Sequence, residues 1–81
     1  MQIPVVKKLV EEATLEQLQT AEENLMEELP LGIEVEGNDE GEQLTHIIAA
    51  AWIIEKMRDD EMPFPKALRA YTQKVRTSIS G

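Results

Sequence analysis

Residues 44–57 read LTHIIAAAWIIEKM and form the most apolar run of this 81-residue chain. Apolar side chains recur every three or four positions, which is the spacing of one helical face, at Leu44, Ile47, Ile48, Ala51, Ile54 and Met57. Much of the remaining circumference is also apolar, at Ala49, Ala50, Trp52 and Ile53. A helix that is apolar most of the way round must be covered on more than one side. The run is shorter than the ~20 residues that span a membrane, so it predicts a central, buried helix.

Both ends of this helix carry clear signals. Asp39 is a favoured N-cap residue, and Glu42 lies three positions later, as in a capping box. Arg58 falls in the last turn, where a positive charge suits the helix dipole. Pro63 and Pro65 follow and cannot continue a helix. The central helix is therefore expected at about residues 41–58.

Apolar stripes on either side of the central helix predict further helices. Pro4 suits the first turn of a short helix at the start of the chain. Thr14 and Gln17 fit a capping box that opens a second helix, which we expect to end near Glu28, before the next proline. A last helix, with a basic face, is expected at residues 65–77.

These elements predict one helical domain, residues 1–81, of the all-α class. The expected architecture is a small three- to four-helix bundle around the central helix. The pattern leaves open whether the first helix belongs to the bundle or is appended to a three-helix core. Residues 33–36 alternate apolar and polar before the turn signal Gly37-Asn38. This leaves a short extended segment open as an alternative to a loop.

Composition restricts the classes of partner and site. The chain has no cysteine, which excludes disulfides and thiolate metal sites. Its net charge of −8 is uneven, because residues 1–42 carry twelve acidic and two basic side chains, whereas residues 62–81 carry four basic and no acidic ones. An acidic body disfavours non-specific binding to nucleic acid and to anionic membranes. The start of the chain lacks the features of a secretory signal, so we expect a cytoplasmic location.

The acidic, glycine-containing segment before the central helix is the strongest candidate for a metal site. Loops rich in carboxylates can hold calcium or magnesium, and the candidate ligands here are Glu34, Glu36, Asp39, Glu42 and His46. Their spacing does not match an EF-hand loop, and zinc sites use three or four protein ligands, commonly His and Cys. We therefore favour a solvated acidic loop with a surface or interface histidine, and expect no cofactor.

No motif for catalysis is present. The chain lacks a glycine-framed serine and the glycine-rich phosphate loops. The acidic pairs at 22–23 and 27–28 lack the Glu-x-x-His motif of bundle metal centres. The prediction is that the chain is not an enzyme and has no catalytic residues.

Trp52 is expected to lie at an interface. Leu44, Ile48 and Ala51 share a face that the other helices can cover, whereas Trp52 lies off that face. Because so small a chain has little else to cover a helix apolar on all sides, the pattern predicts a homodimer. The predicted interface residues are Trp52, Ile53, Ala49 and Phe64.

Three segments together resemble a known family: IPVVKKLVEE at 3–12, IEVEGNDEGEQLTHI at 33–47 and ALRAYTQKVR at 67–76. The chain resembles, over nearly its whole length, a small uncharacterised bacterial protein family, a domain of unknown function. The resemblance implies a complete bacterial protein with one domain per chain. That family has no established activity, so the resemblance supplies no catalytic residues.

Three functional hypotheses follow. The leading one is a small acidic helical protein–protein interaction module, homodimeric and without catalytic activity. Its expected partners are itself and an unidentified protein, rather than nucleic acid or a membrane. The alternative is a divalent-metal-binding module that uses loop 34–42 and His46. The third is a nucleic-acid binder that uses the basic residues of the last helix, Lys66, Arg69, Lys74 and Arg76.

Overall fold

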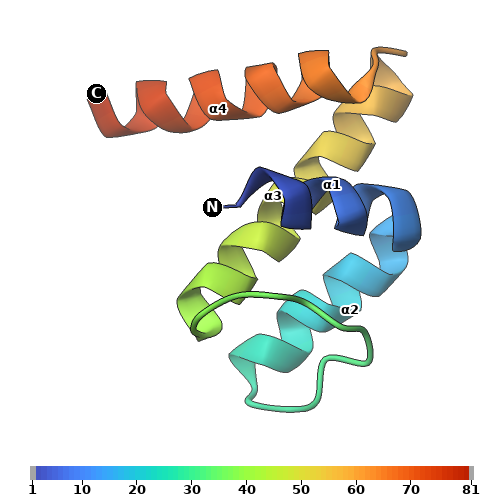
Figure 1. Ribbon diagram of the computed structural model, residues 1–81, viewed down its shortest axis with the longest axis vertical. Coiled ribbons are helices and arrows are strands. Elements are labelled where there is room, and N and C mark those ends of the chain that lie inside the picture. The colour runs from blue at the N-terminus through green and yellow to red at the C-terminus, as the bar shows by residue number, and fades with distance from the viewer. Residues whose placement is uncertain (1, 81) are drawn as a thin grey trace.

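Four helices make up the fold of the computed structural model, which describes residues 2–80 and the side chains of residues 2–76 (Figure 1). They are α1 (Ile3–Glu12), α2 (Leu15–Met26), α3 (Glu40–Asp59) and α4 (Phe64–Ser80). No strand occurs among residues 2–80. The predicted all-α bundle is therefore confirmed, with four helices.

The predicted central helix, α3, packs against each of the other three. Figure 1 shows α1 crossing α3, α2 and α4 on opposite sides of it, and α4 lying across its C-terminal end. The molecule is only 19 Å thick along its shortest axis, about the thickness of two helix layers. In so thin a structure one face of α3 is covered by its neighbours, and part of its circumference stays open.

The helix starts follow the local signals in the sequence. The Thr14 hydroxyl accepts from the Gln17 N–H at 3.1 Å, and the Gln17 side chain accepts from the Thr14 N–H at 2.9 Å, which completes the predicted capping box of α2. The Asp39 carboxylate accepts from the Glu42 N–H at 2.8 Å and caps α3. The Glu42 carboxylate does not return the bond to Asp39; it accepts from the Asn38 N–H at 3.3 Å.

The prediction that the other helices cover the face of α3 carrying Leu44, Ile48 and Ala51 is wrong in part. Ile48 is 39% exposed, and Leu44 and Ala51 are only half-buried. The fully buried residues of α3 are His46, Ile47, Ala49, Ala50 and Ile53. The reason is that α1 and α2 pack on this other face, whereas α4 lies only over the C-terminal end of α3.

The end of α2 differs from the prediction, and the alternative left open at residues 33–36 is resolved as a loop. Helix α2 ends at Met26, before Glu28, and the chain turns there with Glu28 at a left-handed φ of 60°. Residues 33–36 form no strand but run as a loop whose Val35 side chain is buried. The Gln43 side-chain amide donates to the Val35 carbonyl at 3.0 Å. This loop carbonyl is thus satisfied by a side chain rather than by the backbone of a neighbouring strand.

Candidate functional site

His46 is fully buried, and both of its ring nitrogens contact backbone groups. Nε2 lies 2.9 Å from the Gln2 backbone nitrogen and accepts its N–H. Nδ1 lies 2.8 Å from the Glu36 carbonyl oxygen, and donating to it requires the proton on Nδ1. The prediction of a surface or interface histidine is therefore wrong. His46 instead joins the start of the chain and the acidic loop to α3.

The predicted metal ligands are engaged separately. Asp39 caps α3, and Glu42 accepts from Asn38 and from the Gln2 side chain, the latter at 3.0 Å. Glu36 forms an exposed ion pair with Lys8 at 3.8 Å. Among the residues that the structure describes, no three carboxylate or imidazole side chains come together as a metal-binding group. The arrangement offers no support for the metal hypothesis.

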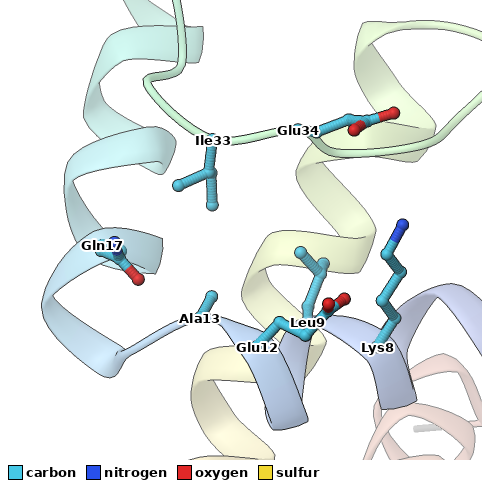
Figure 2. A pocket seen from close by; sticks show the side chains of 7 residues that line it. All are labelled: Lys8, Leu9, Glu12, Ala13, Gln17, Ile33 and Glu34. Atoms are coloured by element: carbon cyan, nitrogen blue, oxygen red, sulfur yellow. The ribbon is translucent and has the colours of Figure 1, made fainter.

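A pocket of about 310 Å³ lies between α1, the start of α2 and the loop. Figure 2 shows the Ile33 side chain pointing into it, with Gln17 on one wall and Lys8 on the other. Its charged groups, from Lys8, Glu12 and Glu34, are all on exposed residues. None of its polar residues is buried, so nothing in this pocket fixes a ligand by a preorganised polar group.

Trp52 lies at the centre of a cluster that contains one further aromatic ring and two lysines. Its ring centroid lies 5.6 Å from that of Tyr71 on α4, with the two rings tilted by 57°. The ammonium groups of Lys74 and Lys56 lie 5.6 and 5.9 Å from the indole centroid, within the range of cation–π attraction. Trp52 is half-buried, so part of its surface remains available to solvent.

A hollow of about 250 Å³ lies beside Trp52, between α2 and α3. Its apolar part consists of Leu15, Ile48, Ala51 and Trp52, and we call these residues together with Tyr71 the Trp52 surface. Glu22 and Glu55 line the same hollow and give it an acidic rim. An apolar floor with a charged rim is the common anatomy of a protein-binding surface.

The four predicted interface residues fall into two groups. Trp52 and Phe64 are half-buried and keep some surface. Ala49 and Ile53 are fully buried in the chain's own core, so they are core residues in this fold and have no surface to offer a partner. Ile48 and Tyr71 were not predicted for the site. The spacing of Ile48 and Trp52, four residues apart on one helix, is the signal that could have identified Ile48.

The comparison with protein families identifies the family to which the chain belongs. A family model described as a family of unknown function, DUF6952, matches residues 1–80. The chain belongs to the DUF6952 family. This confirms the resemblance to a domain of unknown function over nearly the whole sequence. No curated protein and no solved structure matches.

Helix α4 of this DUF6952 chain carries the predicted basic residues, and its cover by the core decreases from Ala67 to Val75. Ala67 is fully buried, whereas Val75, two turns later, is 38% exposed. Lys66, Arg69 and Arg76 are exposed, and Lys74 lies over Trp52. Within residues 2–80, no helix is long and apolar enough to cross a membrane.

The Tyr71 phenol provides a direct test of this arrangement. Burial raises the pKa of Tyr71 above its ordinary value of 10.0, because desolvation disfavours the phenolate. Tyr71 is the only tyrosine, so an absorbance titration reports this group alone. We expect a midpoint above 10.0 in the folded chain and near 10 in urea. The associated stability is present below pH 10 and lost as the pH rises through the folded midpoint. A folded midpoint at or below 10 would contradict this packing.

Proposed function

We propose that this chain is a non-catalytic protein–protein interaction module that binds through the Trp52 surface. The observation that supports this proposal is the indole of Trp52, half-buried beside a hollow that the exposed Ile48 also lines. Tryptophan is enriched among the residues that contribute most to binding free energy. Its rigid ring here is already held by Tyr71, so little conformational entropy is lost when a partner covers it.

The chemistry of the hollow favours a protein partner over a small molecule. The hollow of about 250 Å³ is smaller than the 300–1,000 Å³ typical of ligand pockets. It fits one or two apolar side chains of a partner, with Glu22 and Glu55 placed to meet charged or polar groups at the edge. The sequence-based expectation of a homodimer is one form of this proposal.

Site-specific photo-crosslinking tests the proposal. A photoreactive amino acid at Ile48 is expected to capture a protein, either a second copy or another chain, in the cells that make this protein. The same amino acid at Lys7, an exposed position on α1 outside the Trp52 surface, provides the control. A discrete product from position 48 and none from position 7 supports the proposal. Equal capture from both positions, or none from either, would overturn it.

A further inference from the structure

We infer that the partner of the Trp52 surface is a second copy of this chain, docked about a two-fold axis so that the basic side of each surface meets the acidic side of the other. This inference rests on the proposed function and specifies its partner. It follows from where the charges lie around Trp52.

Opposite charges flank the same indole. On the α2 side, Glu22 and Glu55 line the hollow. On the α4 side, Lys74 reaches over the ring at 5.6 Å, next to the Tyr71 contact. Helices α2 and α4 lie on opposite sides of α3 (Figure 1). The Lys56 ammonium also lies 5.9 Å from the indole centroid, but it is paired with Asp60 at 2.6 Å. The Trp52 surface is therefore acidic at one edge and basic at the other.

These charges form no ion pair with any side chain of residues 2–76. Among the described side chains, ion pairs form between Lys7 and Glu11, Lys8 and Glu36, and Lys56 and Asp60. None of Glu22, Glu55 and Lys74 takes part in them. Their charges are therefore available to opposite charges on a partner that covers the indole.

A two-fold axis satisfies both edges at once. In an isologous dimer the same patch meets itself after a half-turn. With the axis beside Trp52, in the plane of the contact and perpendicular to the line from Lys74 to the hollow, the half-turn brings Lys74 of each copy to the partner's hollow, which Glu22 and Glu55 line. A purely basic partner would suit the acidic edge but would be repelled by Lys74, and a purely acidic partner would meet the reverse conflict. The chain itself carries both charges in the required arrangement.

Charge reversal tests the inference on the full chain by sedimentation equilibrium. One variant combines Glu22→Lys and Glu55→Lys, and a second carries Lys74→Glu. In a dimer of either variant, residue 74 of each copy meets a like charge at residues 22 and 55 of the other copy. Because the symmetry repeats this repulsion, we expect the dimer Kd to rise about tenfold or more. Arg69→Glu changes the same charge as Lys74→Glu at an exposed position of α4 outside the Trp52 surface, and is expected to leave the Kd unchanged.

Mixing the two reversed variants is the decisive step. In the mixed dimer, the lysines introduced at positions 22 and 55 face the glutamate introduced at position 74. The unchanged Lys74 of the first variant faces the unchanged Glu22 and Glu55 of the second. We therefore expect heterodimers to form in preference to either homodimer. Circular dichroism confirms that each variant is folded. A mixture that associates no better than its components would overturn the two-fold arrangement.

The outcomes separate this inference from the proposed function. A wild-type chain that stays at 9.2 kDa at every concentration, while position 48 crosslinks to a different protein, would overturn the inference alone. A monomeric chain without any crosslink from position 48 would overturn both.

Discussion

Replacing His46 with leucine is expected to lower the free energy of unfolding by about 2–4 kcal/mol, because two backbone groups lose their partner. The substitution leaves the Gln2 N–H and the Glu36 carbonyl without the ring that now lies 2.9 and 2.8 Å from them. A domain of this size has a total stability of roughly 4–12 kcal/mol, so the loss is a large share. Urea denaturation followed by circular dichroism measures it.

Two further variants at this position separate the two hydrogen bonds. His46→Gln places a polar group near the position of Nε2, and His46→Asn places one near Nδ1. Each is expected to be more stable than His46→Leu, since each can satisfy one of the two backbone groups. If His46→Leu unfolds at the same urea concentration as the wild type, the two hydrogen bonds do not stabilise the fold.

Isoleucine-to-alanine substitutions at two positions of α3 are expected to affect different properties, stability at Ile53 and association at Ile48. Ile53→Ala removes a fully buried side chain and should lower the free energy of unfolding by about 2–5 kcal/mol. Ile48→Ala removes a side chain that is 39% exposed and should change it by no more than about 0.5 kcal/mol. Ile48→Ala should nevertheless weaken association, because Ile48 lines the hollow beside Trp52.

Thermal unfolding and sedimentation of both variants check this pair of expectations. Each kcal/mol corresponds to a shift of roughly 4–8 °C in Tm for a domain of this length. Equal losses of stability at both positions would mean that the core does not cover the Ile53 face of α3 in preference to the Ile48 face.

The local signals in the sequence predicted the helix starts well. Thr14 with Gln17, and Asp39 with the Glu42 N–H, act between residues three apart, so their bonds follow from short-range geometry. The length and apolar character of residues 44–57 also identified the helix that contacts all the others. Each of these features depends on neighbouring residues alone.

The orientation of α3 could not be predicted in the same way. A helix that is apolar on nearly all sides gives no periodic signal for its covered face, so the choice between Ile48 and Ile53 depends on where the other helices pack. The burial of His46 was missed because its partners are backbone atoms, 44 and 10 residues away. Trp52 was predicted for the interface, and its half-buried ring keeps that prediction open to test.

Sedimentation equilibrium of the wild type and of Trp52→Ala shows whether the Trp52 surface binds a second copy of this chain. We expect the wild type to form a dimer of twice 9.2 kDa, and Trp52→Ala to stay folded while its dimer Kd rises by about 30-fold, or about 2 kcal/mol. Ile48→Ala serves as the second variant if Trp52→Ala does not fold. A wild type that stays monomeric at 9.2 kDa, or folded variants at both positions that associate as tightly as the wild type, would show that this surface does not bind a second copy.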